Sequence, residues 1–160
     1  MKRVLYQSIG IIHSPFEDIA GMPIQTTGAS GIPGTVTVYA RFASALKDLD
    51  GFSHIILLYH FHRCRGFSVE VRPFLDQTTR GVFATRVPRR PNRIGISVVR
   101  LVKRKRNVLY IKDVDIVEGT PLLDIKPYVP EFDSRKTERI GWLAGKVQNV
   151  RGTRSDDRFR

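Results

Sequence analysis

The sequence is poor in several kinds of residue, and each shortage excludes a class of protein. It has 160 residues and one cysteine, Cys64, so no disulfide can form within the chain, which is typical of a reducing compartment. No apolar run reaches the roughly 18 residues of a membrane-spanning helix. The amino terminus also lacks the apolar block and the cleavage site of a secretion signal. We therefore expect a cytoplasmic protein.

Acidic side chains are scarce too. Only 15 aspartates and glutamates stand against 27 lysines and arginines, which gives a formal net charge of +12. A charge of this size concentrates anions near the protein, so we expect a polyphosphate partner. Nucleic acid is the first candidate and an anionic membrane surface the second, although no segment combines a basic with an apolar helix face. The 41% of hydrophobic residues are enough for the core of one domain.

Short runs of β-branched and aromatic residues between turn residues predict a mainly β fold. The predicted strands are residues 4–13, 34–39, 54–62, 81–86, 94–102 and 108–117. Helical spacing over residues 42–49 predicts one short helix that ends at Gly51 in a left-handed conformation. The strands on either side of residues 103–107 should form an antiparallel hairpin. Strands and helices do not alternate, so we expect a barrel or curled sheet.

The stretch from Arg86 to Arg106 is densely cationic, with nine basic residues and no acidic one. Pro88 and Pro91 restrict the backbone of its first part, which limits the directions in which the arginines there can point. Arginine forks held in this way suit phosphate groups. We expect an anion to dock on this turn; the alternative is a set of solvated surface arginines.

Two other patterns resemble known kinds of site but lack the residues or the spacing that such sites need. His60, His62 and Cys64 are predicted to share one face of a strand, but a zinc ion needs three or four ligands and no second cluster supplies the rest, so we predict no metal. A nucleophilic Cys–His pair has even less support. The glycines at 28, 31 and 34 match neither the Rossmann nor the P-loop spacing.

Carboxylates stand out in the block from Asp113 to Tyr128. Asp113 and Asp115 are predicted to share a strand face, and Asp124 alternates with Lys126 and Tyr128 on the following extended segment. Such a group of charges belongs either to a buried ion pair that closes the fold or to a functional site.

The composition changes after Asp133. Residues 134–160 hold eight basic and three acidic residues with a weak apolar set, namely Ile140, Trp142, Leu143 and Val147. We expect residues 1–134 to form the β-barrel domain. Residues 135–160 are then a basic C-terminal segment, partly docked, with its last ten residues mobile.

Several motifs occur in a fixed order along the chain. They are Ile9-Gly-Ile-Ile-His-Ser-Pro, Gly51-Phe-Ser-His, Gly81-Val-Phe-Ala-Thr-Arg, Arg90-Pro-Asn, Ile94-Gly-Ile-Ser, Gly119-Thr-Pro and Asp124-Ile-Lys-Pro-Tyr-Val-Pro. In these motifs, from Ile9 to Asp133, the chain resembles the TrmO family of S-adenosylmethionine-dependent tRNA adenine methyltransferases, also called TsaA-like or YaeB, in a short form without the extra C-terminal domain of longer members. Val87, Arg93 and Glu118 depart from the residues usual in the family.

The resemblance implies a single-sheeted antiparallel β-barrel with one or two short helices, a homodimer, and methyl transfer to N6 of threonylcarbamoyladenosine at tRNA position 37, beside the anticodon. Neither DNA nor a membrane is expected as a partner. It also implies that S-adenosylmethionine is held by Gln25, Thr26, Thr27, Phe61, His62, Arg86, Ile96, Lys112, Asp113, Val114 and Asp115. The candidate catalytic residues are Asp115, Asp124 and Asn92. The residues expected to contact the anticodon stem-loop are Arg89, Arg90, Arg93, Lys103, Arg104, Lys105 and Arg106.

In this interpretation Phe61 offers an aromatic face to the cationic sulfur of the donor. A carboxylate from Asp113, Asp115 or Asp124 accepts the N–H of the attacking amine as charge develops on it. The competing interpretation, which composition alone favours, is a non-catalytic basic β-barrel that binds RNA. A different small-molecule enzyme is the third.

Overall fold

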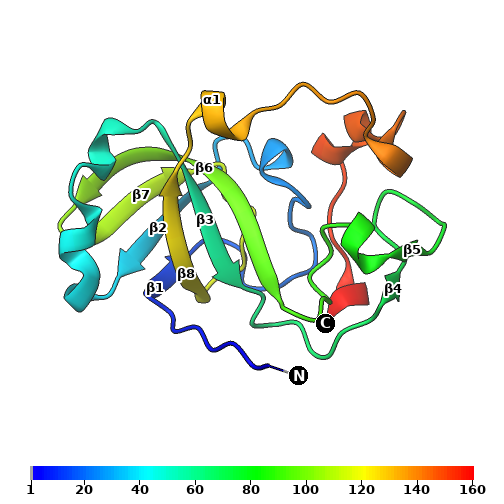
Figure 1. Cartoon of the computed structure of the whole chain (residues 1–160), viewed down its shortest axis with the longest axis horizontal. Coiled ribbons are helices and arrows are strands. Elements are labelled where there is room, and N and C mark those ends of the chain that lie inside the picture. Colours follow the sequence, from blue (N-terminus) through cyan, green and yellow to red (C-terminus); the bar gives the residue numbers. More distant parts are fainter. Residues whose placement is uncertain (1) are drawn as a thin grey trace.

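Six antiparallel strands close into a barrel in the computed structural model, which describes residues 2–160 (Figure 1). Around the barrel the strands follow the order β1, β2, β7, β6, β3, β8, and β8 pairs again with β1. The strands are β1 (Gly10–His13), β2 (Pro33–Val38), β3 (His54–His60), β6 (Ile94–Lys105), β7 (Val108–Lys112) and β8 (Thr120–Pro127). The predicted fold class, a mainly β single-sheeted barrel, is confirmed.

Alternation of side chains along the strands fills the barrel. In β3 the odd-numbered residues Ile55, Leu57 and Tyr59 are buried, while their neighbours are only partly covered. Because successive side chains on a strand point to opposite faces, this pattern puts one apolar row inside. Matching rows from the other strands complete one core. A small barrel filled in this way leaves no chamber for a ligand, so a site has to lie at its end or outside it.

Two expectations about the elements were wrong. Residues 81–86 do not form a strand: β5 (Arg80–Gly81) pairs with β4 (Glu70–Val71), and the chain then turns through the 3-10 helix η4 (Val82–Ala84). β1 begins at Gly10 instead of residue 4. β8, predicted only as an extended segment, is the strand that closes the barrel between β1 and β3.

The predicted helix at residues 42–49 is two 3-10 helices, η2 (Ala40–Leu46) and η3 (Leu49–Gly51). The left-handed residue between them is Asp48, with φ of 64°, and not Gly51. Aspartate tolerates this conformation better than most residues, so no glycine is needed at position 48 and the sequence did not mark the turn there. One α-helix, α1 (Pro130–Asp133), occurs in the described residues, and none of the helices there is long and apolar enough to cross a membrane.

The predicted hairpin is present, with a turn shorter than expected because β6 continues to Lys105. Arg106 turns the chain with φ of 55°. β6 has 12 residues, which at about 3.3 Å per residue gives a strand of roughly 40 Å. Figure 1 shows it running from the lower middle of the view, up and across to the left edge of the molecule. The cationic stretch is thereby divided between the two ends of β6.

The C-terminal segment lies beside the barrel, on the right in Figure 1, together with β4 and β5. It contains the 3-10 helices η5 (Gly141–Leu143), η6 (Val147–Arg151) and η7 (Asp157–Phe159). Phe159 is buried, and Arg160 Nη2 donates to Asp18 Oδ2 at 2.5 Å. The last ten residues therefore make more contacts than their composition led us to expect.

Candidate functional site

A cavity of about 1160 Å³ lies where β3 ends and β6 and β8 begin. It is larger than most ligand pockets, which measure roughly 300–1,000 Å³. The barrel end forms its floor. Its walls come from the long loop that carries Gln25, from the turn that carries Arg86, and from the C-terminal segment.

Eight of the eleven residues expected to hold the methyl donor line this one cavity. They are Gln25, Thr26, Thr27, Phe61, His62, Arg86, Ile96 and Asp115. These residues come from five separate stretches of the chain, and the fold brings them together at the barrel end. The convergence was expected from the resemblance, and it gives the motifs a common location.

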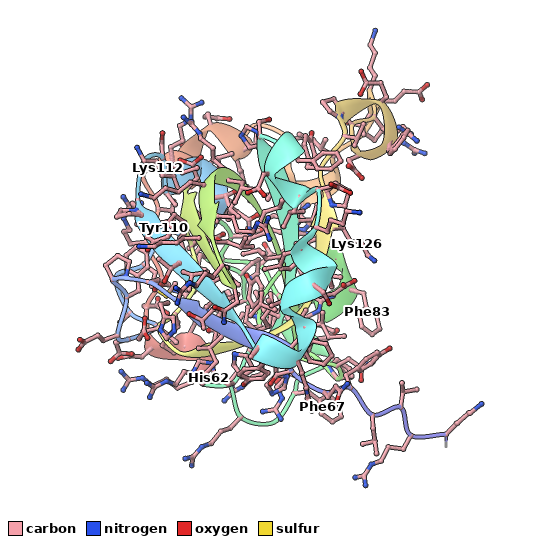
Figure 2. All side chains as sticks on the ribbon, turned by 90° about the vertical axis from the view of Figure 1, so that its left-hand side faces the viewer. His62, Phe67, Phe83, Tyr110, Lys112 and Lys126 are labelled. Carbon is pink, nitrogen blue, oxygen red and sulfur yellow. The ribbon has the colours of Figure 1, made fainter. Side chains whose placement is uncertain are left out.

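The other three lie elsewhere. Val114 is fully buried in the core, and Lys112 borders a second hollow of about 500 Å³ on another side of the barrel. Figure 2 shows Lys112 and Tyr110 at the opposite edge of the view from Phe83. Asp113 Oδ1 accepts from Gly31 N at 2.7 Å. β7 ends at Lys112 and Asp113 has φ of 69°, so Asp113 and Asp115 do not share a strand face as predicted.

Asp115 sits at the end of a chain of three polar side chains. Ser97 Oγ donates to Asp115 Oδ1 at 2.6 Å, and Tyr59 Oη lies 3.0 Å from Ser97 Oγ. Burial raises the pKa of Asp115 to about 6, against the lowering effects of the Ser97 hydrogen bond and the Arg86 charge. Burial, and then the Asp115 carboxylate, also raise the pKa of Tyr59 well above its ordinary value, so the phenol stays protonated.

A glycine makes room for this arrangement. Gly95 faces Tyr59 across the β3–β6 pair, and a Cβ at Gly95 would overlap the tyrosine ring. The sequence did not predict a role at this site for Tyr59 and Ser97, the two residues linked to Asp115. The available signal was the alternation of β6, which places a hydroxyl among buried apolar residues.

Charged and imidazole groups line the same cavity. Arg86 Nη1 donates to Gln25 Oε1 at 3.0 Å and so joins two walls of the cavity. Burial, followed by the charge of Arg63, lowers the pKa of His62, which is therefore neutral at pH 7. Burial raises the pKa of the Cys64 thiol, which argues against a cysteine nucleophile. Residues 2–160 contain no group of three side chains of the kinds that hold a metal ion.

Two predicted catalytic residues lie outside the cavity. Asp124 Oδ2 pairs with Lys126 Nζ at 2.8 Å, but this ion pair lies on the surface and is not buried as the ion-pair alternative had it. Asn92 is exposed in the turn before β6. Of the three candidates, only Asp115 is placed to meet a ligand there.

The atypical Glu118 has a clear structural partner. Burial opposes its ionisation, but the hydrogen bonds from His13 Nδ1 and Ser14 N, both 2.7 Å, outweigh this and keep the pKa of Glu118 below its usual range.

The arginines of the turn brace the backbone. Their main-chain acceptors are Thr85 and Val82 for Arg90 (2.9 and 3.2 Å), Cys64 for Arg93, and Arg160 for Arg89 (2.8 Å). The bonds from Arg90 curl the segment that was predicted as a strand. At the far end of β6, Lys103 lies over the Tyr110 ring at 4.7 Å and Arg104 pairs with Asp50 at 2.8 Å. The predicted tRNA contacts thus form two separate basic surfaces.

Fold and cavity together define a class of protein: a β-barrel with a ligand-sized cavity at one end, lined by arginines and a half-buried carboxylate. It is not a doubly wound nucleotide-binding sheet. Residues 11–134 match the family described as the tRNA-methyltransferase O N-terminal domain. The chain belongs to this family.

Individual relatives agree with the family match. The chain is 57% identical over 156 residues to a probable S-adenosyl-L-methionine-binding protein of Pyrococcus abyssi, covering 98% of this chain and 85% of that one. It is 34% identical over 138 residues to the human tRNA (adenine(37)-N6)-methyltransferase, covering 82% of this chain and 31% of the human protein. The crystal structure of TrmO from Pseudomonas aeruginosa matches with a TM-score of 0.73 at 37% identity, covering 88% of this chain and 63% of that chain. The chain therefore spans less than two thirds of the bacterial protein and about a third of the human one.

Proposed function

We propose that this protein is an S-adenosylmethionine-dependent methyltransferase that modifies N6 of adenine at position 37 of tRNA. The finer form of the proposal is that the acceptor is threonylcarbamoyladenosine, bound with its anticodon stem-loop. Family membership supports the reaction class. The observation that carries the proposal is the convergence of eight expected donor residues, including Arg86 and Asp115, on one cavity.

The cavity fits a cationic nucleoside. When bound, S-adenosylmethionine supplies an electrophilic methyl group on a positively charged sulfur. Phe61 offers an aromatic face, held edge-on against Tyr59 with ring centroids 5.4 Å apart, and such faces attract cations. His62 is neutral and does not repel the donor, and the Asp115 carboxylate attracts it.

The chain's own contribution to the chemistry is positioning and proton acceptance. The reaction forms a bond from N6 to the methyl carbon and breaks the bond from that carbon to sulfur, so alignment supplies most of the rate. The lone pair of N6 is drawn into the purine, and the amine becomes acidic as it is methylated. Asp115 Oδ1 is occupied by Ser97, which leaves Oδ2 to accept this N–H proton.

A homodimer in the cytoplasm belongs to the same proposal. The family resemblance supports the dimer, and the lone cysteine supports a reducing compartment. The alternative function, RNA binding without chemistry, would need no donor cavity.

The test is mass spectrometry of nucleosides from tRNA incubated with the protein, with and without S-adenosylmethionine. Two substrates are used in parallel: tRNA that carries threonylcarbamoyladenosine and the same tRNA without it. We expect a donor-dependent gain of one methyl group on the modified adenosine alone. Methylation of the unmodified tRNA as well would refute the finer proposal. No methyl gain, together with an unchanged melting temperature in the donor, would favour the pure RNA binder.

A further inference from the structure

The wall of the cavity extends beyond the family domain. The match to that domain ends at residue 134, yet nine lining residues lie between Trp142 and Phe159. A segment that was expected to be a partly mobile tail therefore borders the site. In Figure 1 it runs down the right of the molecule, facing the barrel.

We propose that residues 141–160, here called the C-terminal strap, are a working part of the methyl-donor site. The strap forms the outer wall of the site and supports the loop that carries Gln25, Thr26 and Thr27. The inference rests on the proposed function and adds a second binding element to it.

The first support is the contact between the strap and the loop that carries Gln25, Thr26 and Thr27, here called the donor loop. Ser155 N donates to Met22 O at 2.9 Å, and Gly21 N donates to Ser155 O at 2.8 Å. The Ser155 hydroxyl also accepts from Met22 N at 3.0 Å. Gly28 approaches the strap so closely that a Cβ there would lie 3.3 Å from Val150 O. The loop has little regular structure of its own, so its position depends on these contacts.

The second support is that ion pairs at two points hold the strap to the rest of the protein, through residues that do not line the cavity. Asp76 is only 8% exposed and binds Lys146 Nζ of the strap at 2.8 Å. The same carboxylate binds Arg80 Nη2 at 2.7 Å. Arg160 holds the other end of the strap to Asp18 at 2.5 Å. Lys146, and then Arg80, keep the pKa of Asp76 well below its usual range, so the Asp76 carboxylate is ionised at neutral pH and the ion pair persists.

The third support is the connection to Arg86. Trp142 Nε1 donates to Ala84 O at 2.7 Å, two residues before Arg86. The Trp142 ring lies 5.8 Å from the Arg80 guanidinium. Trp142 and Leu143 add apolar surface to the cavity, which suits the flat adenine of the donor and excludes water.

The molecule contains its own reporter, since Trp142 is the one tryptophan of the chain. Titration of the full chain with S-adenosylmethionine, without RNA, should give a saturable change in its fluorescence. The Lys146→Ala variant should bind the donor at least fivefold more weakly in calorimetry. The donor is cationic, so loss of a lysine charge alone would strengthen binding, and a weaker affinity reports release of the strap.

Lys136→Ala is the matched control, because it removes the same charge from the same basic segment at an exposed site with no ion pair in the described residues. Its donor affinity should stay within twofold of the parent. Arg160→Ala, which releases the far end, should resemble Lys146→Ala, and far-ultraviolet circular dichroism should show the barrel intact in all three. If calorimetry detects the donor but Trp142 stays silent and Lys146→Ala binds like Lys136→Ala, the strap inference fails and the proposed function stands. If the parent chain binds no donor at all, the proposed function itself fails.

Discussion

At the scale of single residues, Asp115 carries the clearest chemical consequence. Its carboxylate lies at the cavity with a pKa raised by burial, which is costly to the fold and useful for proton acceptance. Functional groups often have this character, because a group placed for a ligand cannot also be placed for stability.

We expect Asp115→Asn to lower the methyl-transfer rate by about 10² to 10⁴, the range for loss of a general base. The same variant should raise the free energy of unfolding at pH 7 by about 1 to 2 kcal/mol, since an amide has no charge to bury. Single-turnover assays and urea denaturation measure the two effects. Asp124→Asn, outside the cavity, should change the rate far less, and equal losses in both would contradict the assignment.

The pH dependence follows from the same group. The pKa of Asp115 lies near 6 in the folded chain, so the carboxylate is ionised above that pH and protonated below it. The methylation rate should therefore fall as pH drops through about 6. Its effect on stability has the opposite sign: the raised pKa means that the folded state gains stability as pH falls from about 6 toward the ordinary value.

Ser97→Ala should move the lower limb of the pH–rate profile to higher pH, because the Ser97 hydrogen bond lowers the pKa of Asp115. Ser44→Ala, an exposed serine outside the cavity, is the control and should leave the profile in place. An identical profile in both variants would count against Asp115 as the titrating group.

At the scale of elements, the pairing of β3 with β6 fixes the Tyr59–Ser97–Asp115 chain. We expect Gly95→Ala to displace the Tyr59 ring and to cost about 1 to 3 kcal/mol of stability, as overpacking does. Gly51→Ala is the control, since a Cβ there meets open space at ordinary φ. Thermal unfolding measures both, and a Gly95→Ala variant as stable as the control would show that the ring has room to move.

The elements also show which parts of the structure a sequence reveals. β3 was predicted because it is a short run of aliphatic, β-branched and aromatic residues without glycine or proline. β8 was not predicted as a strand because Pro121 and Pro127 are typical of turns. In the structure it pairs with both β1 and β3. The segment 81–86 has the composition of a strand. It curls instead because the Arg90 guanidinium donates hydrogen bonds to the main-chain carbonyls of Val82 and Thr85, and the local sequence does not predict that contact.

The site was predictable to the same uneven degree. Asp115 was selected from the residues together with Asp113 and Asp124, and only the left-handed turn at Asp113 decides which of the first two faces the cavity. The donor loop was found through the family resemblance, since its glycines match no nucleotide motif. Trp142 was expected only to dock its segment, because nothing in its spacing shows that it meets a cavity built from distant parts of the chain.

At the scale of the whole molecule, the division of the cationic stretch matters most. One basic surface borders the cavity, and the other lies at the far end of β6, around Lys105 (Figure 1). A small ligand could touch only one of them. A folded RNA of the size of an anticodon arm is long enough to reach both, so the hairpin should add affinity without touching the reacting base.

We therefore expect the double variant Lys103→Gln and Lys105→Gln to bind tRNA more weakly and with a lower salt dependence. Each phosphate contact contributes roughly 0.7 to 0.9 to the slope of log affinity against log salt, so the slope should fall by about 1 to 2. Filter binding over a range of salt concentrations measures it. Donor affinity should be unchanged, because neither lysine lines the cavity, and this serves as the control for folding. A salt slope equal to that of the parent chain would mean that the tRNA is held at the cavity end alone.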